Sequence, residues 1–282
     1  MILLEIIDLL MIISSDIIIE GMIVVSPRQK KLPFPVLAKT ILGEKAYYAD
    51  SSYGITPDPD KRICSAPSGE EWYPDLSTGR LTAFIPGNPG AGKSYLANEL
   101  ISLLPKECEV LLFTALEEED GNFADLKNRL YKIRMTPENL SRITLSEIRL
   151  RCKKPILLFD DIDKIRDKKV ETLTYKILED ALANGRGHKM HDGEGDIHVI
   201  VTSHSLNDYK KTKYTLENSD YIALFPQSTT YAQMLRLFAK IGLDKGVCDE
   251  VMEMGRRGEV RRVIIKKIAP MYIIAGSIIS LI

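Results

Sequence analysis

Residues with the spacing of a phosphate-binding loop lie between an apolar run and a helical pattern. The defined positions of the motif G-x-x-x-x-G-K-S are filled by Gly87, Gly92, Lys93 and Ser94. In such a loop, backbone N–H groups wrap a polyphosphate, the lysine reaches the outer phosphates, and the serine hydroxyl ligates Mg²⁺. We therefore predict an ATP and Mg²⁺ site in the segment Gly87, Asn88, Pro89, Gly90, Ala91, Gly92, Lys93, Ser94 and Tyr95. Lys93 is also a candidate catalytic residue, and Ser94 is a candidate metal ligand.

The residues around this loop favour a genuine site over a chance match. Residues 81–85 form a short apolar run that is typical of a buried strand. After the loop, helical spacing is shown by Tyr95, Leu96, Leu100, Leu103 and Leu104. Strand, loop and helix therefore follow one another in the order that a phosphate-binding loop requires.

A second motif, "ILLFDDID" at 156–163, follows the pattern of a Walker B strand. Its apolar residues deliver Asp160 and Asp161 to the carboxyl end of a strand, the edge at which parallel sheets bind ligands. Asp160 is a candidate metal ligand that would hold Mg²⁺ through water. Asp161 is the candidate base that would polarise the attacking water. Many P-loop motors carry the longer Glu at this second position.

A third element, "HVIVTSHSLND" at 198–208, places polar residues at the end of another apolar strand. Some P-loop motors insert an extra strand between the phosphate-loop strand and the Walker B strand, and that strand offers a polar group beside the γ-phosphate. We expect the strand ending at Thr202 to occupy this position, with Ser203 and His204 as candidate catalytic residues that orient water or sense the γ-phosphate. The alternative is that Ser203 or Ser205 caps the following helix.

Arg186 is a candidate for a different catalytic task. It follows a helix predicted over about 168–184 and precedes a glycine-rich loop. An arginine delivered across a subunit boundary stabilises charge on the transferring phosphoryl group. The alternative is an ordinary surface arginine.

The apolar runs predict an α/β fold. Short runs at 109–115, 142–146, 155–161, 197–203 and 221–226 are separated by helical or loop stretches, as in a parallel sheet that is covered by helices on both faces. We expect a three-layer P-loop NTPase of the additional-strand, RecA-like type. The chain divides into an aliphatic extension (1–21), a lead-in rich in β segments and turns (22–79) and the ATPase domain (80–282).

Composition and charge are those of an ordinary globular protein without an overall positive field or a cysteine metal site. The chain is 45% hydrophobic and 27% charged, which is typical of a globular protein. Its formal net charge of −1 provides no overall positive field to attract nucleic acid, so such contacts must come from local patches. The cysteines stand far apart without metal-ligand spacing, so reduced thiols are expected at Cys64, Cys108, Cys152 and Cys248.

The first 25 residues are strongly aliphatic but carry carboxylates and no basic residue. Carboxylates are costly in a membrane span, and a signal peptide needs a positive start, so we expect neither. An accessory element and an over-long start, with the working chain beginning near Met22, both remain open.

The order of these motifs and of the later segments resembles the DNA-packaging ATPases of large eukaryotic DNA viruses and their smaller relatives, within the FtsK/HerA-type superfamily. The resemblance covers about 81–276 and rests on "GNPGAGKS", "ILLFDD", "GRGHK", "IVTSHSLND", "LENSDYIALFPQSTTYAQMLRLFAKIGLDK" and "RRVIIKKIAPMYII". The phosphate loop and the paired aspartates are shared with many NTPases, whereas the later segments are more specific. Members often place Gln where Ser203 or His204 stands here, and Glu in place of Asp161.

The resemblance implies a homo-oligomeric ring, with a hexamer as the first candidate, that hydrolyses ATP to drive double-stranded DNA into a preformed capsid. Capsid or portal components would be partners, without a membrane, in the host cytoplasm at a viral factory or in the virion; a non-viral member would be cytoplasmic. Contacts with DNA phosphates would be independent of sequence. Two basic clusters could supply them, one of Lys210, Lys211 and Lys213 and one of Arg256, Arg257, Arg261, Arg262, Lys266 and Lys267. The alternative for each is a solvated surface.

Three other functions share parts of the pattern. An AAA+ ATPase or helicase loader would carry the same loop and aspartates, but it needs a four-helix lid where residues 259–282 look like strands. A small-molecule kinase would share only the loop. A nucleotide-gated assembly protein would bind ATP without motor activity.

Overall fold

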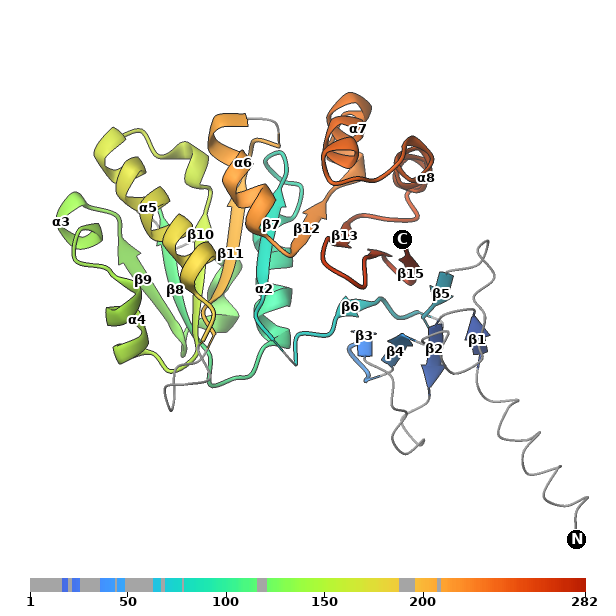
Figure 1. Ribbon diagram of the computed structural model, residues 1–282, viewed down its shortest axis with the longest axis horizontal. Helices are drawn as coiled ribbons and strands as arrows, with labels where there is room; N and C mark the ends of the chain where they lie inside the picture. The colour runs from blue at the N-terminus through green and yellow to red at the C-terminus, as the bar shows by residue number, and fades with distance from the viewer. Residues whose placement is uncertain are drawn as a thin grey trace, which may run out of the picture. The chain divides into compact units, whose positions relative to one another are not determined.

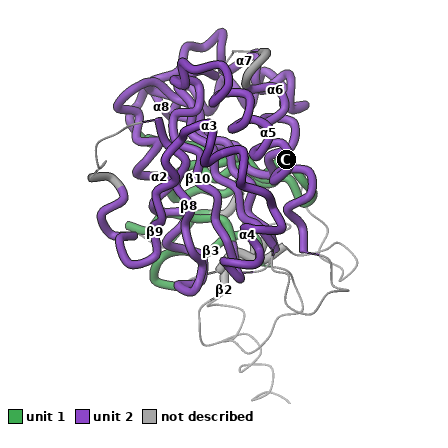
Figure 2. The backbone as a smooth tube through the Cα atoms, turned by 90° about the vertical axis from the view of Figure 1, so that its left-hand side faces the viewer, with its two compact units in different colours: residues 1–75, 259–282 green, residues 76–258 purple. Residues whose placement is uncertain are grey.

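The computed structural model describes residues 17–19, 22–25, 36–43, 45–48, 63–66, 69–77, 79–115, 121–187, 196–206 and 209–282. The chain forms two compact units, which Figure 2 distinguishes by colour. Unit 1 comprises Met1–Asp75 and Glu259–Ile282, and unit 2 comprises Leu76–Gly258. The domain limits expected from the sequence stay predictions.

Unit 2 is built on a parallel sheet. Its strands are β7 (Thr82–Pro86), β8 (Glu109–Thr114), β9 (Leu130–Arg134), β10 (Pro155–Asp160), β11 (His198–Ser203) and β12 (Tyr221–Leu224). They are arranged in the order β12-β7-β11-β10-β8-β9, and each neighbouring pair is parallel. β11 therefore lies between β7, which precedes the predicted phosphate loop, and β10, the predicted Walker B strand. The predicted position of the strand ending at Thr202 is confirmed, and with it the additional-strand fold.

Helices cover both faces of this sheet. They are α2 (Lys93–Leu103), α3 (Pro137–Leu140), α4 (Leu145–Arg151), α5 (Lys168–Asn184), α6 (Tyr209–Asn218), α7 (Tyr231–Lys240) and α8 (Lys245–Arg256), with short 3₁₀ turns η2 (Gly121–Leu126), η3 (Ile162–Lys164) and η4 (Pro226–Ser228). α2 lies on one face and α5 with α6 on the other, as Figures 1 and 2 show from two directions. The predicted three-layer α/β architecture is confirmed.

The strands are apolar because the sheet is buried on both sides. Every residue of β7, β10, β11 and β12 is buried. Phe113 of β8 stacks on Phe159 of β10, with 4.6 Å between ring centroids. A continuous core of this kind fixes the strand ends, and with them the residues that follow each strand.

One predicted strand is wrong. Residues 142–146 do not pair with any described strand: Thr144 caps α4 by accepting a hydrogen bond from the Glu147 N–H at 3.2 Å. The capping threonine, followed three residues later by glutamate, starts a helix within the apolar run.

Unit 1 consists of antiparallel strands. One sheet has the order β1-β2-β4-β3-β6, formed by Ile17–Ile19, Met22–Val25, Lys45–Tyr48, Val36–Lys39 and Tyr73–Pro74. In the other group, β5 (Ile63–Ser65) pairs with β15 (Ile278–Leu281), β15 with β14 (Tyr272–Ala275), and β14 with β13 (Val263–Lys266). The strands expected in residues 259–282 are confirmed. Residues 1–16, which hold most of the aliphatic extension, lie outside the described residues.

Candidate active site

The phosphate loop joins β7 to α2 through glycines in left-handed conformations. Gly90 has φ 77° and Gly92 has φ 104°, values that residues with a Cβ rarely adopt. α2 begins at Lys93, directly after Gly92, so the N-terminal amides of the helix face the loop. A helix N-terminus is a favourable site for a phosphate because its free N–H groups point at the ligand. The predicted order of strand, loop and helix is confirmed.

The start of the loop is fixed against η4. A Cβ at Gly87 would lie 2.9 Å from Cδ2 of Phe225, so this position leaves no room for a side chain. Asn88 donates a hydrogen bond from Nδ2 to the backbone oxygen of Ser228 at 2.6 Å. The turn η4 also meets α8, since a Cβ at Gly255 would lie 2.5 Å from Cβ of Pro226. The loop, η4 and α8 are therefore in close contact.

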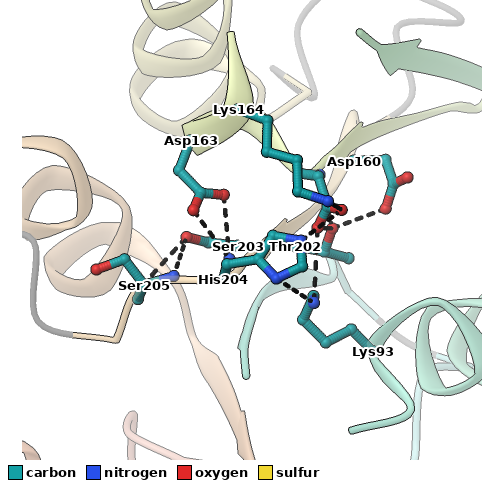
Figure 3. A network of polar contacts seen from close by, with 9 residues as sticks. Lys93, Asp160, Asp163, Lys164, Thr202, Ser203, His204 and Ser205 are labelled. Atoms are coloured by element: carbon teal, nitrogen blue, oxygen red, sulfur yellow. Dashed lines mark hydrogen bonds and ion pairs between the residues drawn. The ribbon is translucent and has the colours of Figure 1, made fainter. Parts of the chain in front are cut away.

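Asp160 and Asp161 lie at the end of β10, and Thr202 of β11 holds both. The Thr202 hydroxyl donates to Oδ1 of Asp160 at 2.7 Å and accepts from the backbone N–H of Asp161 at 2.9 Å (Figure 3). Thr202 and Asp160 are buried, with 0% and 3% of their surface exposed. Asp161 has left-handed backbone angles, φ 47° and ψ 46°, which turn the chain away from the strand. Thr202 thus acts as a clamp between the two strand ends.

Lys93, Asp161 and His204 converge from three different elements. The Lys93 ammonium lies 3.6 Å from Oδ1 of Asp161 and 3.4 Å from Nδ1 of His204. Nε2 of His204 lies 2.7 Å from Oδ2 of Asp161, and Nζ of Lys164 contacts the same oxygen at 3.1 Å (Figure 3). The sequence-predicted residues Lys93, Asp161 and His204 therefore form one polar network.

Burial and neighbouring charges shift the pKa values of Lys93 and Asp161 in opposite directions. Burial lowers the pKa of Lys93, and the carboxylates of Asp161 and Asp160 oppose that effect. Burial would by itself raise the pKa of Asp161, but the hydrogen bond from His204 and the positive charges of Lys93 and Lys164 outweigh it and hold the pKa below its usual value. Asp161 is therefore an ionised carboxylate at neutral pH.

Ser203 does not join the network. Its hydroxyl donates to the backbone oxygen of Ser205 at 3.2 Å and accepts from the Ser205 N–H at 3.1 Å. In this structure the Ser203 side chain holds the local turn at Ser205, and the alternative that it caps the following helix stays a prediction. A catalytic role for Ser203 stays a prediction.

Arg186 lies near the amino ends of the parallel strands, whereas the phosphate loop lies at their carboxyl ends. α5 runs back from the end of β10, and the Ile197 N–H, just before β11, donates to the oxygen of Gly185 at 2.8 Å. The Arg186 side chain is exposed, and its backbone oxygen accepts from Arg149 at 3.1 Å. Within its own subunit Arg186 is remote from Lys93, so a catalytic role requires a neighbouring subunit.

The residues expected to hold Mg²⁺ suit that ion. Asp160 offers a carboxylate at the strand end, and Ser94 follows Lys93 at the start of α2. Mg²⁺ at nucleotide sites takes oxygen ligands from one or two protein groups, phosphates and water. In the part of the chain that the structure describes, no cluster of three or more His, Cys, Asp or Glu side chains is arranged as a metal site.

Sequence reasoning missed two members of the site. Asp163 accepts the backbone N–H of His204 on both carboxylate oxygens, at 3.0 and 3.2 Å. Lys164 contacts Asp161, three residues before it. The short 3₁₀ turn η3 brings both residues to the site. The only sign of this in the sequence is that Asp163 and Lys164 follow Asp161 by two and three residues.

Comparisons with known proteins give one relative in sequence. The uncharacterized protein V3 of Sputnik virophage is 32% identical over an alignment of 224 residues that covers 76% of this chain and 82% of that protein. No family model matches the sequence.

Two solved structures are similar to this chain at low sequence identity. The pCW3 conjugation coupling protein TcpA, solved with ATPgS, is 12% identical, with a TM-score of 0.41 over 83% of this chain and 72% of that one. The cytoplasmic domain of the Thermomonospora curvata type VII secretion ATPase EccC is 11% identical, with a TM-score of 0.42 over 90% of this chain and 29% of that one.

Proposed function

The chain belongs to the family of the virophage V3 protein, and we propose that it is an ATP-hydrolysing motor that moves double-stranded DNA to package a viral genome into a capsid. The observation that carries this proposal is the convergence of Lys93, at the start of α2, with Asp161 and His204, which directly follow β10 and β11. That convergence requires β11 between β7 and β10, which is the arrangement in which a polar strand end faces the phosphate loop.

Each candidate residue has a task in this proposal. The segment 87–95 binds the nucleotide, Lys93 neutralises its outer phosphates, and Ser94 with Asp160 holds Mg²⁺. Mg²⁺ supplies charge stabilisation on the phosphate oxygens. Asp161 and His204 prepare the attacking water, with Ser203 beside them at the strand end. Arg186 reaches the γ-phosphate of a neighbour in a homo-oligomeric ring.

The basic residues proposed to contact DNA differ in their environments. Arg256 and Arg257 at the end of α8 are exposed and share Glu253, at 2.7 and 3.1 Å. Such surface pairs contribute little stability, so they can exchange for DNA phosphates. Arg262 instead is 13% exposed and contacts Glu71 at 2.9 Å and the Tyr73 hydroxyl at 2.6 Å. Arg262 therefore has partners within unit 1, and its contact with DNA stays a prediction.

The second basic cluster proposed to contact DNA lies on α6. Lys213 lies 3.9 Å from Glu217 on α6. The side chains of Lys210 and Lys211 lie outside the described residues. Contacts of the exposed arginines with phosphates would be independent of base sequence.

The strands that follow α8 argue against an AAA+ ATPase or helicase loader. In the described chain β12 is followed by α7, α8 and then β13 to β15, whereas the AAA+ lid is a four-helix bundle. A nucleotide-gated assembly protein would share the phosphate loop but would not show turnover that depends on DNA. Capsid or portal components are the further partners proposed, at a viral factory in the host cytoplasm or in the virion.

A steady-state ATPase assay with and without long duplex DNA tests the proposal. We expect DNA to stimulate hydrolysis, and the stimulation to fall steeply with salt because phosphate contacts release counterions. Short duplexes at equal nucleotide concentration are the control, since a motor that travels along DNA is stimulated less by short tracks. Hydrolysis that ignores DNA of every length would reject the motor and leave the assembly protein.

A further inference from the structure

The proton on the His204 ring is assigned by its two partners. Nε2 faces Oδ2 of Asp161 at 2.7 Å, and an ionised carboxylate only accepts hydrogen bonds. Nδ1 faces the Lys93 ammonium at 3.4 Å, and an ammonium only donates. A neutral His204 ring therefore carries its proton on Nε2 and presents a lone pair at Nδ1.

Asp161 has partners near both of its carboxylate oxygens. Its Oδ1 lies 3.6 Å from the Lys93 ammonium, and its Oδ2 is contacted by the His204 ring and by Lys164. The 2.7 Å contact between Nε2 of His204 and Oδ2 of Asp161 holds the imidazole in one orientation.

The Nδ1 lone pair points toward the side of the site that Lys93 occupies. Lys93 is the residue that approaches the outer phosphates when a triphosphate binds, so its contact with Nδ1 is exchanged at that step. A lone pair facing a phosphate oxygen is repulsive, whereas a lone pair facing water accepts a hydrogen bond. A water between Nδ1 and the γ-phosphate satisfies both groups.

We propose that His204, oriented by Asp161, takes the proton from the water that attacks the γ-phosphate. This inference rests on the proposed ATP hydrolysis and changes the division of tasks within it: His204 is the general base, and Asp161 is its orienting partner. The pair repeats the relation of imidazole and carboxylate that other hydrolases use to fix a tautomer.

The step balances without any further reactant. The water oxygen forms a bond to the γ-phosphorus, the bond from that phosphorus to the bridging oxygen breaks, and its electron pair leaves with ADP. The water proton passes to Nδ1 of His204, and the positive imidazolium faces the Asp161 carboxylate. The ring then returns this proton to solvent, so that ADP, phosphate and one proton are released.

Asp163 is the positioning residue of this arrangement. By accepting the His204 N–H on both oxygens, it holds the end of β11 against η3, which also carries Lys164. Asp161 precedes this turn, so the ring and its orienting carboxylate are held by the same short segment. We expect Asp163→Asn to lower kcat more than it changes KM.

The tautomer is tested first, without turnover. In nucleotide-free full-length protein with ¹⁵N-labelled histidine, we expect the His204 ring to show a protonated Nε2 and an unprotonated Nδ1; the spectrum of His204→Gln identifies its signals. Asp161→Asn, whose amide can also donate, should weaken this preference. A His204 ring protonated on Nδ1 alone would overturn the proposal, whatever the protein hydrolyses.

The proton transfer is tested by substitution and chemical rescue. Gln keeps a hydrogen-bonding side chain but cannot take a proton, so His204→Gln should lower kcat by about 100-fold or more while leaving the affinity for a fluorescent ATP analogue unchanged. His204→Ala should regain turnover when imidazole is added, and Lys93→Ala should not. Wild-type rates in His204→Gln, or no rescue of a folded His204→Ala, would overturn the base assignment while leaving the motor intact. A wild-type chain without any turnover would instead overturn the proposed function.

Discussion

Lys93 is a buried cation whose neighbours are the carboxylate of Asp161 and the ring of His204. Replacing it with alanine removes the charge that the outer phosphates require. We expect Lys93→Ala to weaken ATP binding by about 10- to 100-fold, the value of a charge-assisted hydrogen bond, with an unchanged circular dichroism spectrum. Titration with a fluorescent ATP analogue measures this. Lys169→Ala, an exposed lysine on α5, is the matched control and should bind normally; equal binding by both variants would reject the phosphate-loop site.

The two aspartates at the end of β10 are expected to separate binding from chemistry. Asp160→Asn should weaken binding of Mg²⁺-ATP because the amide is a poorer ligand for a hard cation. Asp161→Asn should bind normally and hydrolyse ATP more slowly, by about 100-fold, because the His204 ring loses its carboxylate. Nucleotide titrations with and without Mg²⁺, combined with single-turnover rates, distinguish the two. Matching binding defects in both variants would contradict this division.

Much of the site could be predicted from the sequence because its key residues directly follow apolar strands. The phosphate loop, Asp160, Asp161 and His204 all stand where a buried run ends, and parallel strands bring such ends to one edge. The Thr202 clamp and the contact of Asp163 with His204 could not be predicted in this way. They depend on the register between β10 and β11 and on a left-handed turn at Asp161, which no local pattern signals.

The elements that the sequence misjudged lie at the edge of the sheet. β9 carries exposed Tyr131, Lys132 and Arg134, so its composition does not mark a buried strand. Residues 142–146 are apolar enough for a strand, but a capping threonine makes them the start of α4. Central strands are specified by burial on two faces, whereas edge elements depend on partners and caps.

The contact between α8 and η4 gives a prediction on stability. Gly255 and Gly246 each lie one residue inside an end of α8, and alanine raises helix propensity by about 1 kcal/mol at such positions. At Gly255, however, the new Cβ would meet Pro226 at 2.5 Å, whereas at Gly246 the nearest atom is Oδ1 of Asp244 at 3.2 Å. We expect Gly255→Ala to be about 1–3 kcal/mol less stable than Gly246→Ala in urea unfolding, because overpacking offsets the propensity gain. Equal free energies of unfolding for the two variants would show that η4 moves to accommodate the new Cβ without a loss of stability.

His198 makes the pairing of β11 with β7 sensitive to pH. Its Nδ1 accepts the Leu81 N–H at 3.0 Å, and burial lowers its pKa from 6.5 to about 4. The neutral ring therefore stabilises the fold fully above pH 6.5, and this contribution is lost between pH 6.5 and 4 because the unfolded chain binds the proton first. The shift corresponds to roughly 3 kcal/mol when complete.

Urea unfolding at pH 7.5 and pH 5 measures this effect. We expect the wild-type chain to lose more stability between these two values than His198→Gln, which keeps an acceptor but does not titrate. Parallel losses in both proteins would assign the acid sensitivity to other groups.

Arg186 can act only on a neighbouring subunit of an assembly, since it lies near the amino ends of the strands and its own Lys93 lies at their carboxyl ends. If it completes a neighbour's site, turnover per subunit should rise with protein concentration. Adding Arg186→Ala subunits that still bind ATP should then reduce activity by more than their mole fraction. Arg151→Ala, which removes an exposed arginine of α4, is the control and should be neutral in such mixtures. Activity that falls in simple proportion to the mutant fraction would leave Arg186 as a surface residue.

The left-handed backbone at Asp161 restricts the amino acids that this position accepts. An L-residue at φ 47° places Cβ near the following carbonyl oxygen, and Asp and Asn tolerate this better than longer side chains because they hydrogen-bond locally. The glutamate often found here in the superfamily that the sequence resembles would gain reach but lose that tolerance. The left-handed backbone at this position therefore favours aspartate, whatever the chemical role of the side chain. A motif search that demands glutamate at this position would pass over chains whose turn is built in this way.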